Sequence, residues 1–238
     1  YADNLDSVFT LAHEMGHAMH TYYSNEHQSI TYAGYLIFVA EVASTCNESL
    51  LMHYMLEHCE DENERKYLMT HFLDGFRTTL FRQAQFAEFE HIAHRKMQKG
   101  EPVTKDVLNE LWHELNVQYY GPDMRVDDEI SYEWMRIPHF YTPYYVYQYS
   151  TGYSAAVAFS KKILEEGKPA VDKYIGNFLC GGCSKNPIEL LKSAGVDMST
   201  PKPVDDALNV FEDYLKQFET ATKKGETSVS YTHLTLPT

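Results

Sequence analysis

The stretch NERKYLMTHFLDGFRTTLFRQAQFAEFEHIAHRKMQK, residues 63–99, decides the fold class. It contains no proline, and its apolar residues follow the period of an amphipathic helix. A basic last turn precedes Gly100 and Pro102, which is typical of a helix C-terminus. The stretch therefore predicts one long helix.

The segments on both sides show the same helical period. No repeat of fixed length and no strong strand alternation interrupts them. We therefore predict a mainly α fold of many helices. Further helices are expected over 5–24, within 31–58, over 105–119 after Thr104 as N-cap, from about Tyr145 to 167, over two short segments within 169–196, and over 204–224.

The composition excludes several classes of protein. The 238-residue chain carries a formal net charge of −14, which argues against binding to nucleic acid. It has no run of about 18 apolar residues that would cross a membrane. Four cysteines do not make a disulfide framework, so we expect reduced thiols and a cytoplasmic protein. No signal peptide is visible, although the chain starts on YADNLDSVF without a methionine.

The C-terminal residues differ in kind from the rest. TSVSYTHLTLPT (227–238) is β-prone and carries no Asp, Glu, Lys or Arg. We expect residues 225–238 to be an appended or disordered tail, and the functional part to lie within 1–224.

The residues His13-Glu14-Met15-Gly16-His17 match the pattern H-E-x-x-H. Residues four apart share a helix face, so both imidazoles can bind one Zn²⁺. Glu14 lies about 100° from His13 around the helix axis. There it can take a proton from a water that the metal has acidified to a pKa of about 7. The alternative is a solvated pair of histidines that matches by chance.

A catalytic zinc ion usually has three protein ligands, so one more residue is needed. Glu41 is the single acid inside the apolar stretch LIFVAEVAST (36–45), where an unpaired carboxylate is costly to bury. We therefore expect Glu41 as the third ligand. Glu48, in more polar surroundings, is the second choice, and a helix-surface role for Glu41 is the alternative.

Two segments, FTLAHEMGHAMHTYYS (9–24) and FVAEVASTCNESLL (38–51), resemble the M3 family of zinc metallopeptidases, most closely its oligoendopeptidase F branch. The resemblance covers about 1–220 and implies a zincin-type helical catalytic domain. It implies one Zn²⁺ held by His13, His17 and Glu41, with Glu14 as general base. His20, at the end of H-E-x-G-H-x-x-H, is not implied as a ligand and is expected to orient the helix or bond a neighbour.

The tyrosine-rich segment IPHFYTPYYVYQYSTGYSAA (137–156) starts with two prolines, which favours a loop that lines a cleft. Tyr O–H and His N–H groups there can donate to an oxyanion. Aromatic core is the alternative. The resemblance implies that His139, Tyr144, Tyr149 and Tyr153 contact substrate, and that Tyr147 competes with Tyr149. We assign Glu14, His139 and Tyr149 as catalytic, and Tyr144, Tyr147 and Tyr153 as substrate-binding.

Two other clusters are expected to be structural. Cys180-Gly-Gly-Cys183 has neither a thioredoxin-like βαβ context nor a second C-x-x-C, so it is interpreted as a turn between helices. His91 and His94, which lie near Glu88 and Glu90, are interpreted as a solvated helix face rather than a second metal site.

The expected activity is zinc-dependent hydrolysis of internal bonds in short oligopeptides. The deep channel of the family would exclude folded proteins. Family members are longer, so we expect this chain to be the C-terminal catalytic part, to need its N-terminal part as partner, and to show weak or no activity alone. The alternatives are a non-catalytic zinc- or peptide-binding fragment, a metallopeptidase of another lineage such as a carboxypeptidase, and a helical interaction protein with a chance motif.

Overall fold

The computed structural model describes residue 2 and residues 4–224, so the predicted tail at 225–238 lies outside the described residues. No described residue lies in a strand, which confirms the mainly α prediction. The helical elements are α1 (Leu5–His27), α2 (Ile37–His58), α3 (Glu62–Gly75), η1 (Phe76–Phe81), α4 (Arg82–Gln98), α5 (Lys105–Tyr120), η2 (Asp128–Arg136), η3 (Pro138–Tyr141), α6 (Tyr147–Glu166), α7 (Lys168–Lys173), η4 (Tyr174–Leu179), α8 (Pro187–Ser193) and α9 (Lys202–Lys224).

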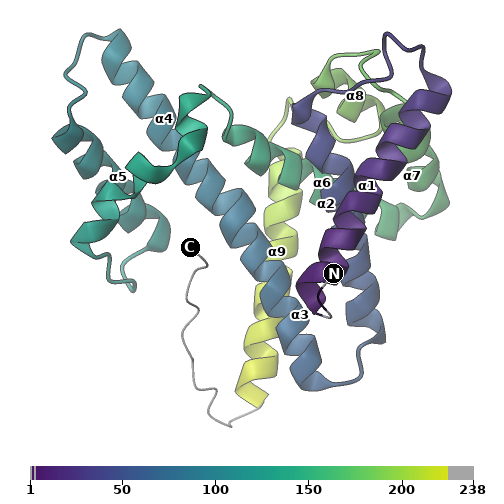
Figure 1. Ribbon diagram of the computed structural model, residues 1–238. Coiled ribbons are helices and arrows are strands. Elements are labelled where there is room, and N and C mark those ends of the chain that lie inside the picture. The colour runs from purple at the N-terminus through teal and green to yellow at the C-terminus, as the bar shows by residue number, and fades with distance from the viewer. Residues whose placement is uncertain (1, 3, 225–238) are drawn as a thin grey trace.

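The long helix predicted over 63–99 is present as the continuous run α3–η1–α4 (Figure 1). Asp61 caps its start, where the carboxylate accepts the N–H groups of Asn63 and Glu64 at 2.9 and 2.8 Å. The middle section, η1, is a π-helical turn with helical backbone angles at both junctions. The sequence period did not predict this turn. The helix is about 55 Å long, enough to connect two parts of the molecule.

The first lobe consists of α1, α2 and α3 with α6 to α9, on the right and at the centre of Figure 1. Its core lies around α6, whose residues 152–160 are all buried. One cluster packs α2 against α6 and η4, through residues such as Val39, Phe159 and Phe178. A second packs α1, α3 and α9 around Met52 and Phe76. This packing holds α1 and α2, the two helices with the H-E-x-x-H motif and Glu41, against a rigid support.

The second lobe consists of α4 with α5 and η2, on the left of Figure 1. Its core gathers aromatic rings around the fully buried Trp112, including Phe86 and Phe89. The N-cap prediction for α5 is confirmed, because Thr104 Oγ1 accepts the N–H of Val107. The chain returns to the first lobe through η2 and η3 and then enters α6.

The helix predicted within 31–58 begins only at Ile37. The residues before it are held in a turn by contacts from distant parts of the chain. The carbonyl of Tyr32 accepts the N–H of Cys183 at 2.8 Å, and the carbonyl of Ala33 accepts the hydroxyl of Ser24. Because these two carbonyls accept hydrogen bonds from residues outside α2, they do not take part in a helical hydrogen-bond ladder.

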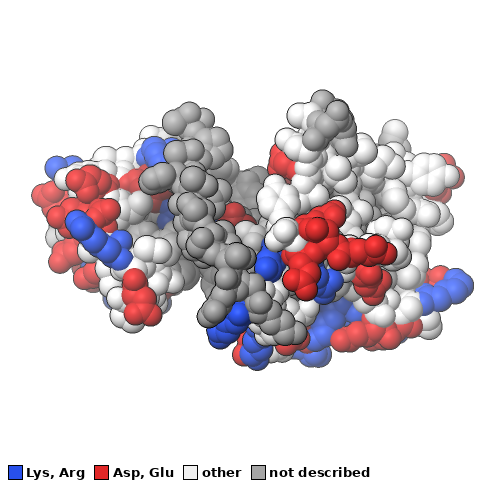
Figure 2. Space-filling model, turned by 90° about the horizontal axis from the view of Figure 1, so that it is seen from below, with Lys and Arg blue, Asp and Glu red and all other residues white. Residues whose placement is uncertain are grey.

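Charge is distributed unevenly over the surface. Viewed from below, acidic side chains gather on parts of both lobes, beside lysine and arginine side chains (Figure 2). The turn from α2 into α3 carries a run of exposed acids, at Glu57, Glu60, Asp61, Glu62 and Glu64. Among the described residues, no helix combines the length and the apolar character needed to cross a membrane.

Candidate metal centre

The site forms where α1 crosses α2 at very short range. Gly16 is buried at the crossing, and a Cβ built on it would lie 2.5 Å from Cα of Ser44. Asn47 Nδ2 donates to the carbonyl of Ala12 at 2.6 Å and so ties the two helices together beside the crossing. The small residue inside the H-E-x-x-H motif therefore allows the backbone of α1 to contact the helix that carries Glu41.

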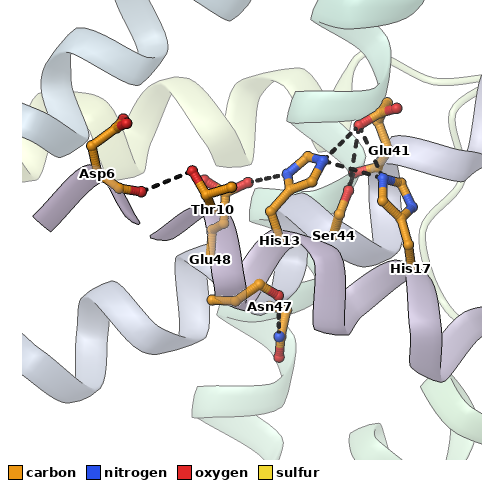
Figure 3. A network of polar contacts seen from close by, with 9 residues as sticks. Asp6, Thr10, His13, His17, Glu41, Ser44, Asn47 and Glu48 are labelled. Atoms are coloured by element: carbon orange, nitrogen blue, oxygen red, sulfur yellow. Dashed lines mark hydrogen bonds and ion pairs between the residues drawn. The ribbon is translucent and has the colours of Figure 1, made fainter. Parts of the chain in front are cut away.

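His13, His17 and Glu41 converge from these two helices (Figure 3). Glu41 Oε2 lies 3.2 Å from Nε2 of His13 and 3.6 Å from Nε2 of His17. The two Nε2 atoms lie 3.1 Å apart. All three groups are half-buried, and one donor atom of each lies within 4.8 Å of the others. Within the described part of the chain, this is the group found with metal-binding geometry.

Glu48 contacts the opposite edge of the His13 ring. Its Oε1 lies 2.5 Å from Nδ1 of His13, so Nε2 is the ring nitrogen that faces Glu41 and His17 (Figure 3). A carboxylate on the second nitrogen fixes the tautomer and orientation of a metal-binding histidine. The structure thus places Glu48, the second choice for a ligand, behind His13 rather than in the group of three.

The local charges fit a cation. Hydrogen bonds that the His13 ring donates to Glu41 and Glu48 raise its pKa to about 10, against the opposing effect of burial. The hydrogen bond from His13 lowers the pKa of Glu41. Two carboxylates therefore stabilise positive charge at this point. Two imidazoles and one carboxylate are also a donor set typical of catalytic Zn²⁺, so the residues present fit the predicted ion.

The two other polar residues of the motif face in different directions. Glu14 is exposed on α1 and does not belong to the converging group. His20 is completely buried and stacks on Tyr35, with ring centroids 3.8 Å apart. Neither ring nitrogen of His20 has a hydrogen-bond partner among the described residues, and burial lowers its pKa to about 4. His20 therefore packs under α1 as a neutral ring, and the predicted hydrogen bond to a neighbour is not formed.

His139 and Tyr149, from η3 and α6, lie in one aromatic cluster. Tyr149 Oη is 3.5 Å from Nε2 of His139, and both rings pack on Tyr145. Burial, together with Tyr145 and the charge of Glu41, raises the pKa of Tyr149 to about 12. Its hydroxyl thus remains protonated at neutral pH and is available as a donor. Sequence reasoning missed Tyr145, the immediate neighbour of the chosen Tyr144.

The remaining tyrosines are spread over different environments. Tyr144 has a positive φ of 56°, donates its N–H to Glu90 at 2.7 Å and packs on His94, so it lies against α4. Tyr147 is exposed near Phe38 at the start of α2. Tyr153 is buried against Phe76. The structure therefore groups only Tyr149, of the predicted tyrosines, with His139.

A cavity of about 300 Å³ adjoins the metal group. It is lined by His13, Glu41 and Glu48 on one side and by Tyr149 and Tyr153 on the other. Space for a bound group thus exists between the converging ligands and the aromatic cluster.

The clusters expected to be structural have local partners. Glu88 accepts from the hydroxyl of Tyr119 at 2.9 Å, and Glu90 accepts the N–H of Tyr144. Neither belongs to a group with metal-binding geometry among the described residues. Cys180 and Cys183 are free thiols in a turn after η4, and burial raises the pKa of Cys180.

Comparison with known sequences gives strong matches. The sequence model of peptidase family M3 matches residues 4–210. The chain is 55% identical over 217 residues to oligopeptidase PepF of Bacillus subtilis (strain 168), and this match covers 91% of the chain and 32% of that protein. It is 43% identical over 225 residues to an oligoendopeptidase F homolog of Lactococcus lactis subsp. lactis (strain IL1403), covering 94% of the chain and 37% of that protein. The chain thus spans about a third of the length of these curated relatives.

Solved structures share the fold. Oligoendopeptidase-F from Enterococcus faecium superposes with a TM-score of 0.84 at 46% identity, over 93% of this chain and 40% of that one. A putative peptidase from Chlamydophila abortus gives a TM-score of 0.86 at 41% identity, over 91% of this chain and 36% of that one.

Proposed function

Because the chain belongs to peptidase family M3, we propose that it is the catalytic part of a zinc-dependent endopeptidase that cleaves internal bonds of short oligopeptides. The observation that carries this proposal is the convergence of His13, His17 and Glu41, whose donor atoms lie within 4.8 Å of one another. The relatives are named as oligopeptidases, but the chain covers about a third of their length, so its substrates are part of the proposal.

His13, His17 and Glu41 would hold the ion. When bound, zinc supplies a Lewis acid that polarises a carbonyl group and lowers the pKa of a water molecule to about 7. Glu48 orients His13 through Nδ1, so that Nε2 faces the site. Ser44 Oγ, 3.4 Å from Oε2 of Glu41, adds a weak hydrogen bond to the third ligand.

Glu14 is the residue that transfers the proton from the attacking water to the leaving amine. Its carboxylate is exposed on the same helix as both histidines, free to accept a proton from the attacking water and to pass it to the leaving amine. Negative charge that develops on the scissile carbonyl oxygen needs donors on the other side of the site. Tyr149 Oη and the His139 ring, 3.5 Å apart, provide them.

The first experiment measures zinc per chain in the purified 238-residue protein and in Glu41→Ala. About one zinc ion in the parent and a large loss in the variant support the three-ligand site. A folded parent that takes up no added zinc contradicts the proposal for this chain. Zinc retained by Glu41→Ala removes Glu41 as a ligand.

The second experiment separates a peptidase from a non-catalytic zinc-binding fragment. Glu14→Gln keeps the size of the side chain but cannot accept the proton, so it should bind zinc like the parent and lose whatever hydrolysis the parent shows. Products from a peptide blocked at both ends distinguish the classes of peptidase, because an internal cut excludes a carboxypeptidase. We propose that the isolated chain cleaves weakly or not at all, and rapid turnover would contradict that.

A further inference from the structure

The cavity beside the metal group extends into the core between α1, α2, α3 and α6. His13, Glu41 and Tyr149 are half-exposed members of its lining, so the cavity is open on the side of the metal group. Its inner wall is apolar and buried, formed by Phe9, Met52, Phe72 and Val157. A volume of about 300 Å³ accommodates a large side chain.

Tyr153 and His71 are two of the polar residues that line this cavity without a side-chain hydrogen bond to a described residue. Tyr153 is 8% exposed, and its hydroxyl forms no hydrogen bond with any described residue. The hydroxyl lies against Gly75 of α3, where an added Cβ would be 3.0 Å from Oη. His71 lies one turn earlier on the same face of α3 and likewise has no hydrogen bond among the described residues.

Polar groups in an apolar cavity are normally satisfied by protein, water or a ligand, so the Tyr153 hydroxyl offers a hydrogen bond to a polar group that enters the cavity. The lining also restricts the charge of that group. Glu41 and Glu48 belong to it, whereas no lysine or arginine does. An acidic side chain would therefore be repelled, and a purely apolar one would leave the Tyr153 hydroxyl without a partner. A basic side chain is not required, because Glu41 and Glu48 are already paired with His13.

We propose that this cavity is a specificity pocket for a substrate side chain with an apolar body and a neutral hydrogen-bonding tip, of which tyrosine is the natural example. The inference rests on the proposed function, because it requires the scissile bond to lie at His13, His17 and Glu41. The ring of the substrate residue would pack against the apolar wall, and its hydroxyl would bond Tyr153 Oη, with the His71 imidazole as the alternative partner.

Amino-acid hydroxamates test this directly, because the hydroxamate binds zinc and the side chain probes the cavity. The zinc-loaded chain is titrated by calorimetry with the hydroxamates of glycine, L-phenylalanine and L-tyrosine. We expect tyrosine to bind about 10-fold more tightly than phenylalanine, as one added neutral hydrogen bond predicts. In Tyr153→Phe the ratio should fall to about one. Tyr141→Phe, which changes a tyrosine that is 89% exposed, is the matched control and should keep the parent ratio.

The outcomes separate the two proposals. Glycine hydroxamate binding with equal affinities for phenylalanine and tyrosine overturns the pocket and leaves the metal site in place. A tyrosine preference that persists in Tyr153→Phe overturns the role of that hydroxyl, and His71→Phe then tests the second group. A parent that binds neither zinc nor glycine hydroxamate overturns the proposed function and the pocket with it. Glycine hydroxamate binding by Tyr153→Phe also shows that the variant retains a folded site.

Discussion

Gly16 and Ser44 are in backbone contact, since a Cβ at Gly16 would lie 2.5 Å from Cα of Ser44. Gly16→Ala should therefore push α1 away from α2, destabilise the chain by about 1–3 kcal/mol and weaken zinc binding. Gly176→Ala is the matched control, because that helical glycine has no heavy atom within 4 Å of the added Cβ. Urea unfolding and zinc titration of both variants check the prediction. Equal behaviour of the two would contradict it.

Glu48 should affect metal affinity without being a ligand. Glu48→Ala removes the acceptor 2.5 Å from Nδ1 of His13 and should weaken zinc binding about 10- to 100-fold. Glu48→Gln keeps an acceptor oxygen and should recover part of that loss. Competition with a fluorescent zinc chelator gives the affinities. If both variants lose zinc as completely as Glu41→Ala, Glu48 belongs among the ligands.

His20 should make stability depend on pH. Its pKa in the folded chain is about 4, below the ordinary 6.5, so folding favours the neutral ring. This contribution is present above pH 6.5 and is lost as the pH falls toward 4. Between pH 7 and 5 the parent should lose about 2 kcal/mol more than His20→Leu. Denaturant unfolding in EDTA at both pH values measures the difference, with the exposed His27→Leu as control. Parallel losses in parent and His20→Leu would show that His20 is protonated in the fold.

Tyr149 should bind a tetrahedral centre more strongly than a planar one. Tyr149→Phe removes the hydroxyl 3.5 Å from His139 and should weaken the binding of a phosphinic peptide to the zinc-loaded chain about 10-fold or more. Binding of the corresponding uncleavable ground-state peptide should change less. The exposed Tyr141→Phe serves as control. An equal loss for both ligands would assign Tyr149 to general substrate binding.

The helical period predicted the long helices because their apolar faces are continuous in the sequence. Residues 31–36 depart from that rule, since their backbone is fixed by Cys183, which lies far along the chain. A contact between residues so far apart in the chain cannot be predicted from the local sequence pattern. The π turn η1 likewise interrupts a stretch whose sequence period is helical throughout.

The metal group could be predicted because its ligands lie on only two helices, and the spacing of His13 and His17 along one of them is visible in the sequence. Glu48 lies seven residues after Glu41, two turns along α2, so the shared face was visible in the sequence even though its role behind His13 was not. Tyr144 and Tyr145 could not be separated in this way. They precede α6, and the positive φ of Tyr144 directs the backbone so that Tyr145 packs on His139.

The segment that carries His139 is fastened to the second lobe. Trp134 donates to Asn109 of α5 at 2.9 Å, and Glu133 pairs with Arg82 of α4. His13, by contrast, belongs to the first lobe, and the α3–η1–α4 helix connects the two. The helix therefore sets the position of His139 relative to the metal group: bending it at the π turn would move His139 away from His13 and also from Tyr149, which α6 holds in the first lobe.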